Sequence, residues 1–145
     1  MKKKILISTG GSGGHVIPAT TIYDHLKNNF EVIISTDVRG LNYLEVEKHK
    51  IFEIDTPKLN KSILLPYRIL KVFFLTLKSL LLFKKQKIQI LISTGGYMSL
   101  PLCFAAKISG IKIFLLEPNM VIGRANKFFL NFCEKIICYS NNIIK

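Results

Sequence analysis

The chain has 145 residues, of which 49% are hydrophobic, and its formal net charge is +12 from 21 Lys and Arg against 9 Asp and Glu. This length fits one domain with a single core and excludes a second domain of ordinary size. The positive charge favours an anionic partner, either a molecule or a membrane surface, unless it only reflects a genome biased towards Lys and Ile.

The placement of the charge is uneven. Residues 56–116 contain no Asp or Glu but ten Lys and Arg, which compositional bias alone does not explain. The three cysteines, Cys103, Cys133 and Cys138, lack the spacing of a zinc site, so we expect reduced core residues of a cytoplasmic protein. The N-terminal MKKKILIS has an apolar run too short for a signal peptide and is expected to be a first strand.

Short runs of Ile, Val, Leu and Phe predict six strands along the chain. Several are apolar at every position, which is typical of strands covered on both faces. The strands are expected at residues 4–7, 31–35, 51–54, 88–92, 111–116 and 135–139. Helix-length stretches lie between them, at residues 16–28, 40–49, 61–84, 98–109 and 121–132. This alternation predicts the α/β class, with a Rossmann-like open parallel sheet and helices on both faces.

The expected helix at 61–84 is the most apolar part of the chain, but Pro66 and several basic residues make it a poor transmembrane span. At 100° per residue Arg68, Lys71, Lys78 and Lys85 fall within a sector of about 100°. The apolar arc that fills most of the remainder is wider than packing against one side of a sheet requires. It is either a core helix with a solvated basic stripe or an interfacial helix on an anionic bilayer. The interfacial reading assigns membrane contact to Arg68, Lys71, Phe74, Lys78, Leu81 and Lys85.

The first strand ends in STGGSGGH at residues 8–15, where four glycines permit a sharp turn and leave backbone amides accessible to an anion. The spacing is not that of a dinucleotide site, because Val16 stands where G-x-G-x-x-G needs its last glycine. No Lys-Ser or Lys-Thr pair follows, which disfavours a P-loop. His15, in the first turn of the next helix, is a capping or packing residue, a general base on a sugar hydroxyl beside the anion cradle, or a hydrogen-bond donor to phosphate.

Two later loops also follow predicted strands, and ligands of open parallel sheets bind at that end of the strands. TGGYMSLP at 94–101 offers two glycines, Tyr97 and Ser99, and EPNMVIGRAN at 117–126 offers Glu117 and two asparagines. Glu117 is the first carboxylate after residue 55. It either caps the next helix, pairs with Arg124, or takes part in chemistry.

Together the three loops carry a resemblance to a known family. GGSGGH at 10–15 with Pro18, GGYMSLP at 95–101 and EPNxxxGxxN at 117–126 are similar in order and spacing to the N-terminal domain of the MurG family of peptidoglycan N-acetylglucosaminyltransferases. The resemblance covers essentially the whole chain. It implies the N-terminal half of a GT-B glycosyltransferase of family 28, inverting, with no cofactor and no catalytic metal.

The family moves N-acetylglucosamine from UDP-GlcNAc to the 4-hydroxyl of MurNAc in lipid I, an undecaprenyl-diphosphate-linked MurNAc-pentapeptide. The product is lipid II, used in peptidoglycan synthesis and hence in cell shape and division. The resemblance therefore implies a peripheral protein at the cytoplasmic face of the plasma membrane. Nucleic acid is not an expected partner, since the lysines alternate with Leu and Ile and no recognition module is present.

The same resemblance assigns roles to individual residues. Catalysis falls to His15 or Glu117, and contact with UDP-GlcNAc to Ser12, Gly13, Gly14 and Asn119. The acceptor or its diphosphate is expected to meet the glycine turns and their neighbours, namely Gly10, Gly11, Gly95, Gly96, Tyr97, Ser99 and Asn126. Leu116 and Pro118 replace the His and Gln of the family's HEQN motif, so any hydrogen bonds of those two side chains are lost.

The family also has a second domain of comparable size that binds most of the donor, and residues 1–145 correspond to the acceptor-side and membrane-binding domain alone. Three accounts remain. The chain is a fragment of such an enzyme, the acceptor half of a two-chain transferase whose other domain acts in trans, or a non-catalytic remnant that binds lipid diphosphate or membrane.

Overall fold

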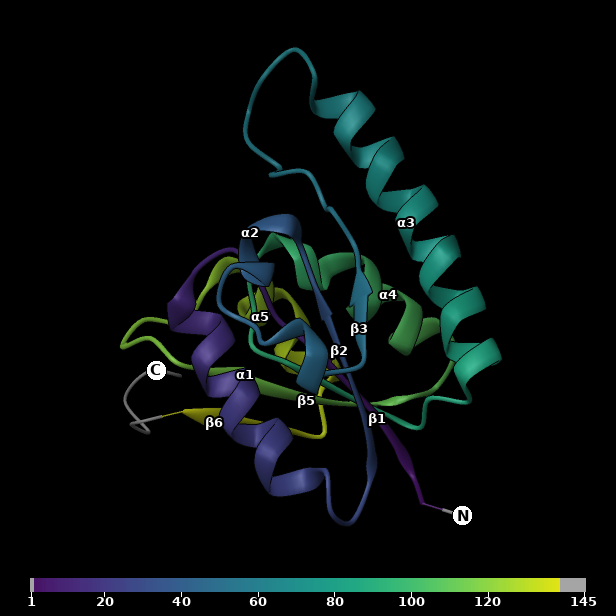
Figure 1. The fold of residues 1–145 in the computed structure, drawn as a ribbon. Coiled ribbons are helices and arrows are strands. Elements are labelled where there is room, and N and C mark those ends of the chain that lie inside the picture. Colours follow the sequence, from purple (N-terminus) through teal and green to yellow (C-terminus); the bar gives the residue numbers. More distant parts are fainter. Residues whose placement is uncertain (1, 139–145) are drawn as a thin grey trace.

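The structure is a computed structural model that describes residues 2–138. Its centre is a six-stranded parallel sheet in the order β3-β2-β1-β4-β5-β6 (Figure 1). The strands are β1 (Lys4–Ser8), β2 (Glu31–Thr36), β3 (Ile51–Glu53), β4 (Ile90–Ser93), β5 (Lys112–Glu117) and β6 (Lys135–Cys138). The order reverses between β1 and β4, which is the switch point of a doubly wound sheet. The predicted fold class is confirmed, although Tyr139 of the last predicted strand lies outside the described residues.

The helices differ from the prediction mainly at their ends. They are α1 (Gly13–Leu26), α2 (Val38–Leu41), α3 (Leu65–Gln86), α4 (Leu100–Ile108) and α5 (Arg124–Phe129), with 3-10 turns η1 (Val46–Lys48), η2 (Tyr97–Ser99) and η3 (Leu130–Phe132). α3 and α4 begin later than predicted because each has a proline in its first turn, where a missing N–H costs nothing. The predicted helix at 40–49 is wrong. In its place α2 ends after four residues and η1 follows a turn.

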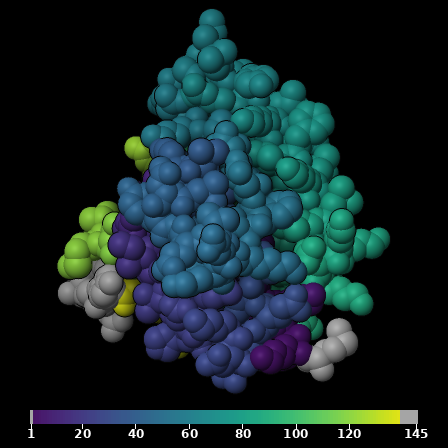
Figure 2. Space-filling view, in the orientation of Figure 1, coloured from purple at the N-terminus to yellow at the C-terminus, as the bar shows by residue number. Residues whose placement is uncertain are grey.

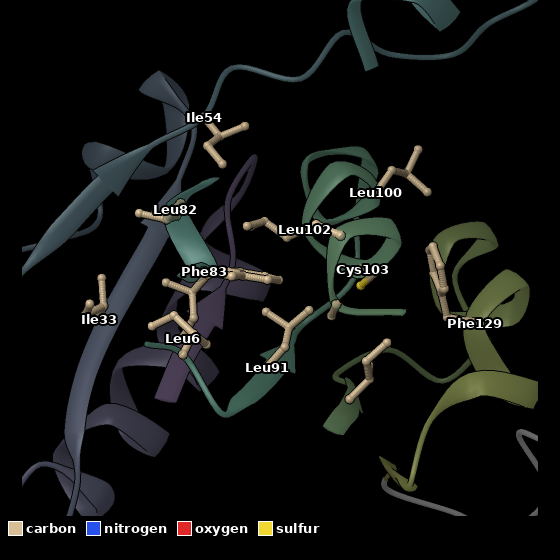
Figure 3. Packing of buried hydrophobic residues seen from close by; sticks show 14 of the residues in the cluster. Leu6, Ile33, Ile54, Leu82, Phe83, Leu91, Leu100, Leu102, Cys103 and Phe129 are labelled. Carbon is tan, nitrogen blue, oxygen red and sulfur yellow. The ribbon is translucent and has the colours of Figure 1, made fainter. Parts of the chain in front are cut away.

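The main hydrophobic core lies between the sheet and the helices α3, α4 and α5 (Figure 3). Leu6, Ile33 and Leu91 point from the strands towards this side, and Leu82 and Phe83 of α3 pack against them. The opposite face carries Ile5, Ile7 and Val32 under α1. Helices on both faces of the sheet are thus confirmed. Because β1 and β4 are parallel neighbours, the glycine turns that follow them lie at the same end of the sheet.

Cysteine burial is uneven. Cys103 is fully buried in the main core, and burial raises the pKa of its thiol to about 12. Cys133 is half-buried, and burial is the main cause that raises its pKa as well. A thiol with a raised pKa remains protonated near neutral pH and reacts slowly. The prediction of a core cysteine is confirmed for Cys103.

Three serines sit in register at the carboxyl ends of neighbouring strands: Ser8 pairs with Ser35 on one side and with Ser93 on the other. All three are fully buried. They alternate with Ile7, Ile34 and Ile92, so they share the face that α4 covers. The small Ser93 side chain there leaves room for Cys103 of α4, whose thiol lies beside its hydroxyl.

α3 is apolar on two opposite faces. Its inner face buries Val72, Leu82 and Phe83. Its outer face leaves large apolar side chains exposed, among them Tyr67 at 65%, Phe74 at 60% and Leu81 at 69%. The N-terminal end of α3 and the loop before it project beyond the sheet (Figures 1 and 2). The apolar arc is wider than the packed face, as the sequence predicts, and within residues 2–138 no helix is long and apolar enough to cross a membrane.

Arg68, Lys71 and Lys78 lie to one side of this exposed apolar face, whereas Lys84 falls within it at 100° per residue. Lys71 is 3.7 Å from Asp55, and Lys78 lies over the Phe52 ring at 5.7 Å. Arg68 donates to the carbonyl of Lys58 at 3.3 Å. All three partners are in or near β3 and the loop after it, so these cations border the outer face of α3 without covering it.

Candidate active site

The loops after β1, β4 and β5 meet because these three strands are neighbours in the sheet and run parallel. They enclose a small hollow of about 150 Å³ at the carboxyl ends of the strands. Six residues predicted for the site line it together with Gly123, Arg124 and Ala125. The six are His15, Gly95, Gly96, Tyr97, Glu117 and Asn119. Residues up to 104 positions apart are therefore brought to one place by the sheet order.

His15 is held in one orientation at this hollow. Its Nδ1 lies 2.6 Å from the carbonyl oxygen of Thr94, across the junction of the first two loops. A carbonyl oxygen can only accept a hydrogen bond, so Nδ1 carries the proton and Nε2 of the neutral ring keeps a free lone pair. The ring is half-buried. A free lone pair on Nε2 is what the general-base interpretation requires.

The first glycine turn offers fewer bare amides than the sequence suggests. The Gly11 N–H donates to Asp37 Oδ1 at 2.8 Å, and the Ser12 N–H donates to the Gly10 carbonyl at 3.0 Å. The expectation of a bare amide is therefore wrong for Gly11. α1 begins at Gly13, earlier than predicted, and among the described residues the amides of Gly13 and Gly14 have no acceptor. Any anion contact at this turn falls to those two amides.

The second turn is similar. The Gly95 N–H donates to Ser93 Oγ at 3.1 Å, so its amide is not bare either. The Ser99 hydroxyl is buried and donates to the Gly96 carbonyl at 2.7 Å. Ser99 thus fixes the turn from inside and does not face the hollow, whereas Tyr97 is half-exposed at its rim.

Glu117 is almost fully buried, with 1% of its surface exposed. Oε1 accepts from the backbone N–H and the side-chain amide of Asn119, and Oε2 accepts from the Gly123 N–H and the Asn126 side chain. With four donors the carboxylate organises the loop from 117 to 126 and caps the start of α5. Its ion pair with Arg124 is not formed within 4.0 Å in the described structure. The geometry favours a positioning role for Glu117 in this loop.

We expect Glu117→Gln to lower the free energy of unfolding by about 1–3 kcal/mol, because the new amide NH₂ faces N–H donors and leaves them without an acceptor. Chemical denaturation of the 145-residue chain measures this. Glu47→Gln, at an exposed position, is the control and should leave the free energy of unfolding within about 0.5 kcal/mol of the parent. An unchanged stability of Glu117→Gln would contradict the loop-organising role.

Asp37 is a site residue that the sequence reasoning missed. It follows β2 and is only 3% exposed. Oδ1 accepts from the amides of Gly11 and Gly40, and Oδ2 accepts from Arg39 Nε at 3.1 Å and Nη2 at 2.9 Å. Burial acts to raise the pKa of Asp37, but the hydrogen bonds from Gly11, Gly40 and Arg39 outweigh it and the pKa is lowered. The signal available in sequence was an Asp at the carboxyl end of a strand, three residues before Gly40.

A lowered pKa makes stability depend on pH in a definite direction. The unfolded chain binds a proton at Asp37 near the ordinary value of 3.8, before the folded chain does. The stabilisation by the carboxylate is therefore full above that pH and is lost as the pH falls through the lowered folded pKa. We expect the difference in unfolding free energy between the parent and Asp37→Asn to shrink from about pH 5 to about pH 2. Urea denaturation across this range tests it, and a difference independent of pH would contradict it.

The architecture and the site define a class of protein: a doubly wound α/β domain whose glycine turns and one oriented histidine meet at the carboxyl ends of its central strands. The sequence matches the profile of the glycosyltransferase family 28 N-terminal domain over residues 5–138. Since this match spans most of the chain, the chain belongs to that family.

Individual relatives agree. The chain is 56% identical, over its whole length, to the UDP-N-acetylglucosamine--N-acetylmuramyl-(pentapeptide) pyrophosphoryl-undecaprenol N-acetylglucosamine transferase of Pelagibacter ubique, and covers 41% of that protein. The transferase of the same name from Caldicellulosiruptor saccharolyticus is 37% identical over 92% of the chain, which covers 38% of it. The chain thus spans about two fifths of the length of the curated relatives it matches. The crystal structure of MurG from Acinetobacter baumannii superposes with a TM-score of 0.84 at 20% identity, over 100% of this chain and 43% of that one, and supports the fold.

Proposed function

We propose that this chain supplies the acceptor-side half of an enzyme that transfers N-acetylglucosamine from UDP-GlcNAc to the MurNAc 4-hydroxyl of lipid I and gives lipid II. The observation that carries the proposal is the His15 ring, which the Thr94 carbonyl holds through Nδ1 and which lines a hollow formed by all three loops of the family resemblance. The 56% identity to a transferase of that name along the whole chain supports the choice of substrates.

In the proposed reaction, His15 Nε2 takes the proton of the acceptor hydroxyl as its oxygen attacks the anomeric carbon of GlcNAc. The bond from that carbon to the UDP oxygen breaks on the opposite face, so the configuration inverts and UDP leaves with the bonding electrons. The Nδ1–H bond to the Thr94 carbonyl keeps the ring aimed and disperses the positive charge it gains. The imidazolium then releases its proton to water or to the departing product.

The other loops are proposed to hold the two substrates. The amides of Gly13 and Gly14 have no acceptor among the described residues, and the exposed Ser12 hydroxyl makes no cap hydrogen bond, so all three groups at the start of α1 suit a diphosphate. Asn119 is exposed, and its backbone N–H and side-chain NH₂ both donate to Glu117 Oε1. Its side-chain oxygen remains for a hydroxyl or amide of the donor sugar. Arg124 is exposed at the rim of the hollow and suits the negative charge of either substrate.

The remainder of the donor site is proposed to come from a second domain, in cis or in trans, as the length of the relatives suggests. Of the three accounts that the sequence leaves open, we favour a piece of a longer transferase. The two-chain enzyme and the non-catalytic remnant are the other outcomes of the experiment below.

We further propose that the protein works at the cytoplasmic face of the plasma membrane, bound peripherally through α3. The exposed apolar face of α3, bordered by Lys71, Lys78 and Lys85, has the composition of an interfacial helix. A lipid-linked acceptor requires an enzyme that reaches the membrane surface, and α3 follows a loop that projects from the body of the domain (Figure 1).

Fusion of residues 1–145 to the part of the Pelagibacter ubique transferase that follows its matching segment tests the function. We expect this fusion to transfer GlcNAc from UDP-GlcNAc to a lipid I analogue, while the 145-residue chain alone transfers none. Chromatography of the radiolabelled product gives the rate, with the unmodified Pelagibacter transferase as the positive control. Activity when the two parts are mixed as separate chains would favour the two-chain account. No transfer by either, with the lipid analogue still bound, would favour the remnant.

A further inference from the structure

The loops after β1 and β2 are locked together around one buried carboxylate. A Cβ on Gly10 would overlap Met98 Sδ and lie 2.6 Å from Asp37 Oδ1. A Cβ on Gly40 would overlap Thr36 Oγ1 and come within 2.9 Å of Gly10 Cα. The two loops therefore touch backbone to backbone at these glycines. Asp37 Oδ1 joins them by accepting both the Gly11 and the Gly40 amide.

Capping α2 does not explain this arrangement. α2 has four residues, and its cap requires only an acceptor for the Gly40 amide. A buried carboxylate is costly unless it is paired and hydrogen-bonded. Here one oxygen bridges two loops and the other is held by Arg39, whose side chain is 55% exposed. A cap of α2 does not need the hydrogen bond from the Gly11 amide to Asp37 Oδ1. Gly11 lies two residues before α1 begins.

The residues that follow Gly11 connect its hydrogen bond with Asp37 to the start of α1 and to His15. Gly11 has a φ of +78°, which other residues rarely adopt, so the direction of its amide depends on the turn being held. The Ser12 carbonyl, next along the chain, accepts from the amides of His15 and Val16 and thereby starts α1. A turn released at Gly11 would shift the bare amides of Gly13 and Gly14 and the ring of His15 together.

We propose that Asp37 is a positioning residue of the transfer reaction: it sets the first glycine turn, and through it His15 and the two bare amides, without touching substrate. This inference rests on the proposed function. It predicts that the acceptor oxygen matters and the negative charge does not. Asn at position 37 retains an oxygen for both glycine amides, and the half-exposed Arg39 released from its ion pair is solvated by water.

The test compares Asp37→Ala and Asp37→Asn in the active fusion described above. We expect kcat to fall about 10- to 100-fold in Asp37→Ala, because a small displacement of a catalytic group has an effect of this size. Asp37→Asn should stay within about threefold of the parent, which is rescue by the conservative variant. Leu82→Ala, a substitution in the main core, is the control because it should destabilise the fold at least as much as Asp37→Ala does. It should retain kcat at a temperature at which it is folded.

Hydrogen exchange of the 145-residue chain gives a second readout that needs no activity. The Gly11 amide should exchange faster in Asp37→Ala and remain protected in Asp37→Asn. The proposal would be overturned if Asp37→Ala kept the parental kcat. It would also be overturned if Asp37→Asn lost as much kcat as Asp37→Ala, or if Leu82→Ala did. Failure of the proposed function is distinguishable: the unsubstituted fusion would transfer nothing, while Gly11 exchange would still respond to Asp37.

Discussion

Replacing His15 by Ala is expected to lower kcat for GlcNAc transfer by about 10²- to 10⁴-fold, the usual contribution of a general base. The half-buried ring has its Nδ1–H tied to the Thr94 carbonyl and its Nε2 free. Without it the acceptor hydroxyl would have to lose its proton to water. The measurement is the initial rate of product formation by the fusion at saturating concentrations of both substrates.

His25 provides a matched control for this substitution. Its Nδ1 also lies near a backbone carbonyl, that of Thr21 at 2.9 Å, but the ring is exposed on the far turns of α1. His25→Ala should retain kcat within about twofold, as surface substitutions away from a site do. A rate for His15→Ala within tenfold of the parent would show that another group takes the proton, and Glu117 would then be the next to test.

Removing apolar side chains from the outer face of α3 is expected to weaken binding to anionic vesicles by about tenfold for each large side chain. Phe74→Ser and Leu81→Ser are the informative variants because these side chains are 60% and 69% exposed and lie outside the main core. Phe74 also meets the exposed Phe73 ring edge to face, with the ring centroids 5.9 Å apart. Vesicle flotation of the 145-residue chain, with vesicles rich in an acidic phospholipid, measures the partition coefficient.

Val46→Ser is the matched control, since Val46 is also 60% exposed but lies in η1 on another part of the surface. It should bind as the parent does. Lys78→Gln and Lys85→Gln should weaken binding to acidic vesicles by about fivefold each and leave binding to neutral vesicles unchanged. Binding of the parent to a soluble polyanion, with none to vesicles, would contradict the membrane proposal and favour a nucleic-acid partner.

The strands were predictable because a parallel sheet with two covered faces requires continuous apolar runs, and each of the six runs became a strand. Helix ends were harder. The start of α1 at Gly13 and the loss of helix over 42–45 depend on how the turns pack, which no periodicity encodes. The cap of α2, Asp37, also accepts from the Gly11 amide of the neighbouring loop, a contact that no local pattern encodes.

In the site, the three loops and His15 were predictable because glycine turns after parallel strands must meet at one edge of the sheet. The direction of individual polar groups was not. Asn126 is buried, and its side-chain NH₂ donates to the Leu116 carbonyl and to Glu117. It therefore holds the loop from 117 to 126 on its buried side. Such inward roles depend on contacts between residues far apart in sequence, and so does that of Asp37.

Two hydrogen bonds hold the first glycine turn and its histidine, and they join residues at very different separations along the sequence. Gly11 and Asp37 are 26 residues apart, within the first βαβ unit, whereas His15 and Thr94 are 79 apart. Closing the shorter loop costs less chain entropy. We therefore expect the turn to take its shape early in folding, while the histidine gains its orientation only after β4 has paired with β1. A folding intermediate that contains only the first unit would hold the glycine turn in place but leave its histidine without a fixed tautomer.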